Sequence, residues 1–259
     1  MSTTKIGLLH LGVLMKIKID CTANLGDFCN ALPVISGLSK HFKEKIHLII
    51  RPEMRKFNGI KEFLKYQPMI EDVDFSDDLI VFGDIMTLSS WTRMDQEAAD
   101  RPIETCRYEN WVRDNYGLEF QVDDDFEIEV DPMIDIAIET TNKTIIGDRW
   151  SAKQDPSVDA RRKTNVVEGG ANLNPLEVFY LDYTKPIMYN LNLIKNSPKH
   201  FITTFTGIGI IADLMHKETI VCWDEDMRTW DGHPVGFDFK RHYYGDRNAK
   251  LVYVKDLKI

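Results

Sequence analysis

The segment from Asn24 to Pro33 constrains the fold of this chain more than any other stretch of the sequence. It follows a short strand-like run at 16–20, and the apolar spacing after it predicts a helix over 27–42. A strand, a glycine turn and a helix start place Asp27 at the carboxyl edge of a sheet, where open α/β sheets bind ligands. A carboxylate there can accept a proton from an attacking hydroxyl, or it can serve only as a helix cap.

A second segment, Phe201–Trp223, has the same plan near the other end of the chain. It predicts a strand, a Thr-Gly turn, a short helix and another strand. Hydroxyls and backbone N–H groups at a helix start form an anion site that suits a diphosphate. Thr204, Thr206 and Gly207 are the candidate residues for that site.

The rest of the chain alternates between strand and helix patterns, which predicts parallel sheets built from βαβ units. Strands are expected at 16–20, 46–50, 79–82, 144–147, 165–168, 178–181, 201–203, 219–223 and 251–254. Helices are expected at 27–42, 52–66, 104–116, 186–196 and 207–215. The segment Asp131–Asn142 begins with Asp-Pro and ends with Thr-Thr-Asn, as an interdomain linker does.

These patterns divide the chain into five expected parts. Residues 1–14 are a dispensable extension, 15–131 an N-terminal domain, 132–143 a linker, 144–236 a C-terminal domain and 237–259 a tail that packs back on the core. At 259 residues and 43% hydrophobic content, the chain can bury a substantial core.

The four cysteines have no CxxC spacing, so we expect reduced thiols in a cytoplasmic protein, with Cys222 packed in the core. The longest N-terminal apolar run, Ile6–Leu14, is far shorter than the roughly 20 residues of a membrane span. No metal-ligand motif is present in the sequence.

Charge is unevenly distributed in this acidic chain, whose formal net charge is −9. Residues 40–65 hold eight basic side chains against three glutamates, which indicates either a face for an anionic acceptor or an ordinary solvated helix face. The eight are Lys40, Lys43, Lys45, Arg51, Arg55, Lys56, Lys61 and Lys65. The acidic runs at 71–78 and 123–125 are expected to be solvated loops.

The two helix-start segments together resemble the ADP-heptose:lipopolysaccharide heptosyltransferase family. Gly26-Asp27 and Leu32–Ile35 match the N-terminal family pattern, and the segment from Glu104 to Leu118 is similar to the family helix that ends the N-terminal domain. The chain departs from the family at Phe205 and Ile210, where the family usually has Asp and His. The departure at Phe205 falls on a contact implicated in holding the donor sugar.

The resemblance implies a GT-B-like α/β fold, with two Rossmann-like parallel-sheet domains facing a cleft. It implies an inverting, metal-independent glycosyltransferase that uses a nucleotide-diphosphate-sugar as co-substrate and needs no other cofactor. Asp27 matches the family's general base, and Asn24, Gly26 and Lys56 lie on the acceptor side. The donor side comprises Thr204, Thr206 and Gly207 with four cations of the first C-terminal loop: Arg149, Lys153, Arg161 and Arg162.

Several alternatives remain open at the level of sequence. The acceptor is a glycan or a modified DNA base of the kind that some bacteriophage enzymes glycosylate. A non-catalytic nucleotide-sugar binding module and a nucleotide-sugar epimerase are alternative functions. Trp150 either stacks on the nucleotide base or covers the domain edge. The sequence does not determine the oligomeric state.

Overall fold

The computed structural model describes residues 15–20, 25–76, 85–89, 101–132, 142–147, 174, 176–204, 206–223, 244–245 and 249–257. The first half of this part forms a four-stranded sheet in which every pair of neighbouring strands is parallel, in the order β3-β2-β1-β4. Its strands are β1 (Met15–Asp20), β2 (Ile46–Ile50), β3 (Ile70–Phe75) and β4 (Ile85–Ser89).

The second half forms a five-stranded parallel sheet in the order β6-β5-β7-β8-β9. Its strands are β5 (Thr144–Gly147), β6 (Val178–Tyr180), β7 (Phe201–Thr203), β8 (Thr219–Trp223) and β9 (Lys250–Tyr253). Both sheets confirm the expected parallel α/β architecture. The expected strands at 79–82 and 165–168 lie outside the described residues.

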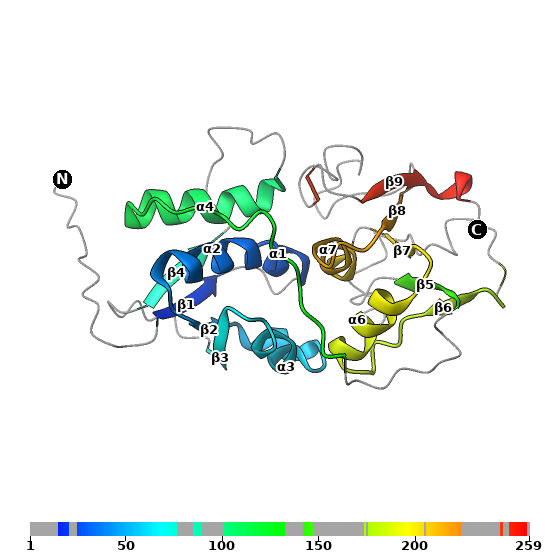
Figure 1. Cartoon of the computed structure of the whole chain (residues 1–259), viewed down its shortest axis with the longest axis horizontal. Coiled ribbons are helices and arrows are strands. Elements are labelled where there is room, and N and C mark those ends of the chain that lie inside the picture. Colours follow the sequence, from blue (N-terminus) through cyan, green and yellow to red (C-terminus); the bar gives the residue numbers. More distant parts are fainter. Residues whose placement is uncertain are drawn as a thin grey trace.

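Helices connect the strands and lie between and around the two sheets (Figure 1). They are α1 (Leu25–Cys29), α2 (Leu32–Phe42), α3 (Ile60–Lys65), α4 (Ile103–Tyr116), α6 (Ile187–Asn196) and α7 (Gly207–Leu214), with 3-10 helices η1 (Pro52–Lys56) and η3 (Val254–Asp256). The expected helices at 104–116, 186–196 and 207–215 agree with α4, α6 and α7 to within one residue at each end.

Two expected helices are each broken in two, and the local sequence explains both breaks. The helix expected over 27–42 stops at Cys29, and α2 begins with Pro33 in its first turn. A proline inside one continuous helix would lose a backbone hydrogen bond and clash with the preceding turn, whereas the first turn tolerates it. The helix expected over 52–66 is interrupted at Gly59, whose φ of +74° is left-handed.

The acidic run at 71–78 was expected to be a loop, and for its first five residues that prediction is wrong. Ile70–Phe75 is the edge strand β3, with Ile70 and Val73 buried. The acidic side chains of this strand pair with lysines of neighbouring elements: Glu71 with Lys45, Asp72 with Lys65, and Asp74 with Lys61. Charged side chains are common on edge strands because they discourage pairing with other chains.

The second acidic run also differs in part from a solvated loop. Asp123 is held by the ammonium of Lys40 at 2.7 Å and by the hydroxyl of Ser36 at 2.5 Å, and its side chain is only 10% exposed. Asp124 forms an ion pair with Arg101, with 2.6 Å between the carboxylate oxygen and the guanidinium nitrogen. These contacts link α2, and the residue Arg101 that precedes α4, to the segment that follows α4.

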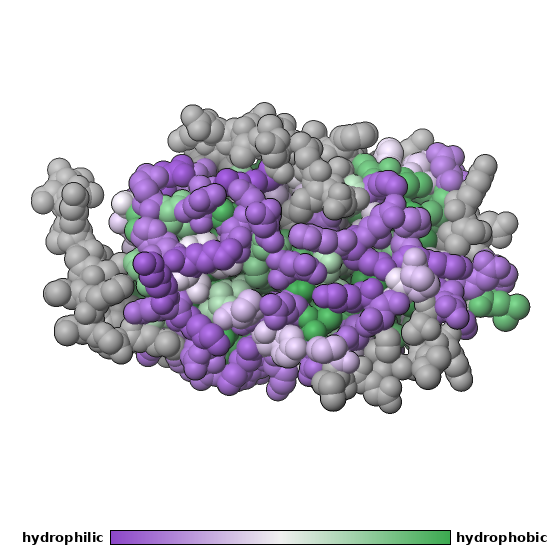
Figure 2. Space-filling model, viewed as in Figure 1, coloured by the Kyte–Doolittle hydropathy of each residue, from purple (hydrophilic) through white to green (hydrophobic). Residues whose placement is uncertain are grey.

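A single large hydrophobic cluster includes residues from both sheets and from the helices between them. Backbone hydrogen bonds also join the halves: Ile128 donates to Leu214 at 2.9 Å, and Ile187 donates to Asn58 at 2.8 Å. On the face in Figure 2, hydrophilic residues cover most of the described surface, and hydrophobic residues show only in small patches.

The described cysteines Cys29, Cys106 and Cys222 are all buried and unbridged, as expected of reduced thiols. Burial raises the pKa of the Cys222 thiol to about 12, which agrees with a packing role. Among the helices that the structure describes, none combines the length and the apolar character needed to cross a bilayer.

Candidate active site

The order of the strands defines one position in each sheet where a ligand is expected. In the first sheet the chain moves from β1 to β2 on one side and later returns to β4 on the other side of β1. In the second sheet it moves from β5 to β6 on one side and then to β7 on the other. Open α/β sheets bind ligands at such switch points, outside the carboxyl ends of the strands.

Helix α1 follows the carboxyl end of β1, and helix α7 follows the carboxyl end of β7. Figure 1 shows α1 and α7 side by side near the middle of the molecule. The contact is direct at their first residues, because a Cβ atom placed on Gly207 would lie 2.7 Å from the backbone nitrogen of Gly26 and 2.8 Å from Cβ of Leu25. The two segments singled out in the sequence therefore meet in the structure.

Asp27 lies in the first turn of α1, where its side chain is half-buried. Phe28 and Cys29, the two residues that follow Asp27, are 1% and 0% exposed and anchor α1 in the core. The buried Tyr108 of α4 donates its hydroxyl to the Asp27 backbone carbonyl at 3.3 Å. Helices α1 and α4 thus hold the backbone of Asp27 in place, and a negative charge is electrostatically favourable at a helix start.

Thr206 caps the start of α7. Its backbone is extended, with φ −136° and ψ 158°, and its hydroxyl accepts a hydrogen bond from the Gly209 N–H at 3.3 Å. The Thr203 hydroxyl donates to the Gly147 carbonyl at 2.6 Å and lies 2.9 Å from the Thr206 hydroxyl. These contacts link the ends of β5 and β7 to the start of α7.

Thr203 is a residue that the sequence analysis missed. Its signal was present, since three threonines occur within the four residues 203–206, but only the register places Thr203 beside Gly147. The neighbouring Thr204, expected on the donor side, is 1% exposed, and its hydroxyl oxygen is buried. In this conformation Thr206 and the Gly207 backbone lie at the helix start, whereas Thr204 is part of the interior.

Ile210 occupies the position at which the similar family usually has a histidine. Its Cδ1 atom lies 2.8 Å from where a Cβ on Gly26 would be, so it packs against α1. The side chain is 3% exposed. An apolar contact between the two helices therefore replaces a polar group at this position.

Lys56 ends the 3-10 helix that follows β2, so it lies at the same edge of the first sheet as Asp27. Its ammonium lies 5.1 Å from the centroid of the Phe57 ring. Surrounding protein atoms partly desolvate the ammonium and lower its pKa, although the side chain as a whole is exposed. The predicted site residues Asn24, Arg149, Lys153, Arg161 and Arg162, together with Phe205 and Trp150, lie outside the described residues.

Most of the basic residues at 40–65 are paired with carboxylates. Five of the eight lie within 4 Å of an acidic oxygen, and a sixth, Arg55, stacks over the Phe75 ring at 4.6 Å. The five are Lys40, Lys45, Arg51, Lys61 and Lys65. The positive charge available on this face is therefore smaller than the sequence alone indicates.

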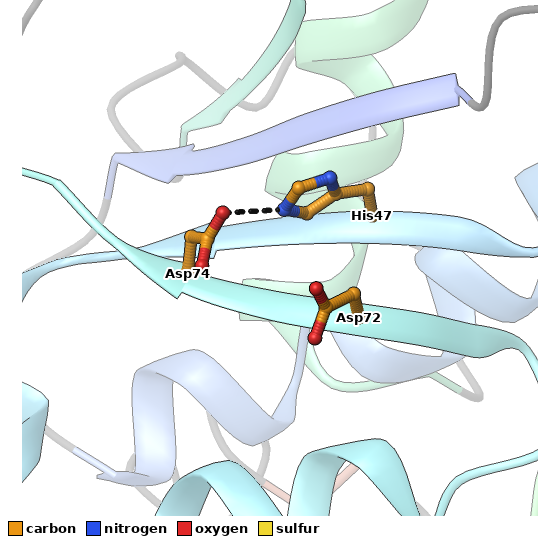
Figure 3. A group of neighbouring side chains, drawn as sticks. All are labelled: His47, Asp72 and Asp74. Carbon is orange, nitrogen blue, oxygen red and sulfur yellow. Dashed lines mark hydrogen bonds and ion pairs between the residues drawn. The ribbon is translucent and has the colours of Figure 1, made fainter.

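One group of side chains on β2 and β3 brings together donor atoms of the kind that bind metals. The ring of His47 and the carboxylates of Asp72 and Asp74 offer atoms that all lie within 4.8 Å of one another (Figure 3). His47 Nε2 lies 2.9 Å from Asp74 Oδ2. Both carboxylates also pair with lysines of α3, so these ion pairs account for the group without a metal ion.

A cavity of about 310 Å³ lies at the other end of α7, away from Thr206. Its wall includes Arg101, Asp123, Asp213 and His216. It is separate from the meeting point of α1 and α7, which is where the sheet topology and the helix starts place a ligand.

Comparisons with known proteins identify solved structures that are similar to this fold. No protein-family model matches the chain, and no curated protein matches it by sequence. Among solved structures, a family 9 glycosyltransferase from Veillonella parvula matches with a TM-score of 0.55 and 12% identity over 94% of this chain and 88% of that one.

Two enzymes from E. coli also match. ADP-heptose lipopolysaccharide heptosyltransferase II has a TM-score of 0.53 and 11% identity over 92% of this chain and 90% of that one. Heptosyltransferase WaaC, solved with ADP, has a TM-score of 0.51 and 8% identity over 92% and 93%. The chain therefore has the fold of the family 9 glycosyltransferases.

Proposed function

We propose that this protein is an inverting glycosyltransferase that moves a sugar from a nucleotide-diphosphate-sugar to a hydroxyl acceptor. The observation that carries the proposal is the contact between the start of α1, which bears Asp27, and the start of α7, which bears Thr206 and Gly207. A carboxylate and an anion-binding helix start thus lie together at the switch points of two parallel sheets. The fold shared with family 9 glycosyltransferases supports the same assignment.

In this proposal one domain binds the acceptor and the other binds the donor. Residues 15–131 form the acceptor domain and 144–236 the donor domain, joined by 132–143, and the carboxyl edges of the two sheets face one cleft. Residues 237–259 form the tail. The acceptor hydroxyl lies near Asn24, Gly26 and Lys56, and the four cations at 149–162 contribute to holding the donor.

In the proposed reaction Asp27 takes the proton of the acceptor hydroxyl, whose oxygen attacks the anomeric carbon of the donor sugar. A new glycosidic C–O bond forms as the bond to the diphosphate breaks, and the anomeric configuration inverts. The nucleoside diphosphate leaves with the bonding electron pair. Thr206 and the N–H groups at the start of α7 stabilise its charge, so the mechanism needs no metal ion.

The acceptor is a glycan or a modified base in DNA. DNA binding would weaken steeply with salt, because neutralised phosphates release counterions, whereas glycan binding would depend little on salt. The ion pairs within residues 40–65 leave few basic residues there for phosphates, which favours the glycan. Binding of the two acceptors at 50 and 200 mM salt distinguishes them.

One observation favours a second candidate, a binding module that holds a nucleotide-sugar without transferring it. Ile210 fills the position of a family histidine with an apolar contact to α1. In that case Asp27 is only an acidic residue at a helix start. The two candidates differ in turnover but not in donor binding.

The decisive experiment is an assay for release of nucleoside diphosphate from a panel of nucleotide-sugars, with and without candidate acceptors. The proposal predicts release that depends on an acceptor and disappears in Asp27→Asn. Donor binding without release, for every acceptor class, would support the binding module instead. No binding of any nucleotide-sugar would contradict both.

A further inference from the structure

The cavity at the end of α7 has walls from both halves of the chain. The last turn of α7 and the residues after it contribute Asp213, Leu214 and His216. The rest of the described wall comes from the first half, where α2 and α4 begin and in the segment that follows α4. Its volume of about 310 Å³ lies at the lower end of the range for small-molecule sites, which are common where two domains meet.

Part of this wall is apolar and firmly packed. Leu214 and Phe126 are 3% and 6% exposed and belong to the main hydrophobic cluster. Pro33 and Pro102, at the starts of α2 and α4, also line the cavity. These side chains suit the hydrocarbon part of a small ligand.

Asp123 supplies a carboxylate oxygen to the same wall. The Lys40 ammonium and the Ser36 hydroxyl both contact its Oδ2, at 2.7 and 2.5 Å, so Oδ1 is the oxygen that remains for a ligand. The Asp123 side chain is only 10% exposed. A charged hydrogen bond from a ligand to this partly desolvated carboxylate would be stronger than one made in water.

The charges around the cavity favour a cation over an anion. The Arg101 guanidinium pairs with both Glu109 and Asp124, at 2.8 and 2.6 Å. Together with the lysine on Asp123, these ion pairs contain three carboxylates and two cations. The carboxyl end of α7, where the helix dipole is negative, lies at the wall, and Glu104 in the first turn of α4 offsets the positive end of that helix.

His216 lines the cavity in a backbone conformation that glycine adopts more easily. Its φ of +55° is left-handed, directly after the last turn of α7. The side chain is exposed, and within the described part of the chain the imidazole makes no hydrogen bond or ion pair. The ring can therefore contact a ligand without giving up a bond within the protein.

We propose that this cavity binds a small organic cation, with an ammonium or guanidinium group on an apolar body. The cationic group donates to Oδ1 of Asp123 beside the carboxyl end of α7, the apolar body packs on Phe126 and Leu214, and the His216 ring contacts it from the rim. The eight residues of α7 span about 12 Å, so this site lies apart from Thr206 and does not depend on the proposed function.

The test compares three ligands of nearly the same shape and different charge. Calorimetric titration of the full chain with 2-phenylethylammonium, 2-phenylethanol and phenylacetate isolates the contribution of the charge. We expect the cation to bind about ten to a hundred times more tightly than the alcohol, and the anion to bind most weakly. Asp123→Asn should remove most of the advantage of the cation, whereas Asp125→Asn, the same change at an exposed residue outside the wall, should retain it.

His216→Gly gives a second measurement that does not depend on a weakened fold. The variant should raise the unfolding temperature, because glycine takes a positive φ without steric cost. It should also bind 2-phenylethylammonium roughly threefold to tenfold more weakly, because the ring contact is lost. A more stable protein that binds the cation less well would support a role for His216 in the site.

Three results would overturn the inference. They are equal binding of the three ligands, an advantage of the cation that persists in Asp123→Asn, and failure of all three ligands to bind at millimolar concentration. A parallel titration with ADP, GDP and UDP reports on the start of α7 alone, so failure of the cation site and failure of the proposed function are distinguished.

Discussion

Gly26 and Gly207 come from opposite halves of the chain, and each leaves the space into which the other's helix fits. A methyl group on Gly207 would meet backbone atoms of Gly26 and Leu25 at 2.7–3.0 Å. A methyl group on Gly26 would meet Cδ1 of Ile210 at 2.8 Å and Cα of Gly207 at 3.4 Å. The first obstruction is rigid backbone, whereas the closest atom in the second is the end of a flexible side chain.

This difference gives a prediction about paired substitutions. Gly26→Ala should destabilise the fold by about 1–3 kcal/mol through overpacking. Ile210→Val removes Cδ1, so the double variant should be more stable than the sum of the single changes by at least about 0.5 kcal/mol. Gly207→Ala should show no such relief from Ile210→Val. Urea unfolding measures all five variants, and additive effects for Gly26 and Ile210 would contradict the close contact.

Asp27→Asn should lower turnover by a factor of about 10²–10⁴ and leave donor affinity unchanged, because the amide cannot accept the acceptor's proton. Asp125→Asn makes the same change at an exposed acidic residue and should leave turnover unchanged. The measurement is release of nucleoside diphosphate at saturating donor. Near-normal turnover of Asp27→Asn would remove Asp27 from the role of base.

Thr206→Ala should destabilise the protein by about 1 kcal/mol, because the Gly209 N–H loses its capping oxygen. Thr206→Ser retains that oxygen and should stay within about 0.5 kcal/mol of the wild type. Urea unfolding gives both values. If the two variants are equally destabilised, the methyl group of Thr206 is the important part and the cap is not.

We expect the buried Cys222 thiol to make the stability of the fold depend on pH at high pH. Burial raises its pKa from 9.0 to about 12, so between these values the unfolded chain loses a proton that the folded chain keeps. Its contribution to stability is thus complete below pH 9 and is lost as the pH rises toward 12. Over that window, the free energy of unfolding of the wild type should fall by about 1.4 kcal/mol per pH unit more than that of Cys222→Ala. Equal slopes would show that Cys222 ionises normally in the fold.

The sequence predicted the parallel α/β architecture because apolar periodicity, glycine turns and helix starts are local signals. It placed the strands at 46–50, 144–147, 201–203 and 219–223 with the same bounds as β2, β5, β7 and β8. It failed where the determining contact is not local. The charges of β3 look like those of a loop until their lysine partners on other elements are known.

The candidate site also has features that the sequence predicted and features that it did not. Asp27 and Thr206-Gly207 were found because each follows a strand and begins a helix. The contact between Gly26 and Gly207 and the support of Thr206 by Thr203 depend on strand order and register. These features required the structure, because their residues are separated in the sequence or carry no motif.

Thermal unfolding with a panel of nucleoside diphosphates tests whether the start of α7 holds the diphosphate of a nucleotide. A ligand at 100 times its dissociation constant adds about 2.7 kcal/mol of stability, which for a chain of this size raises the unfolding temperature by roughly 5–10 °C. We expect such a rise with at least one nucleoside diphosphate. An unchanged unfolding temperature with every one of them at millimolar concentration would contradict it.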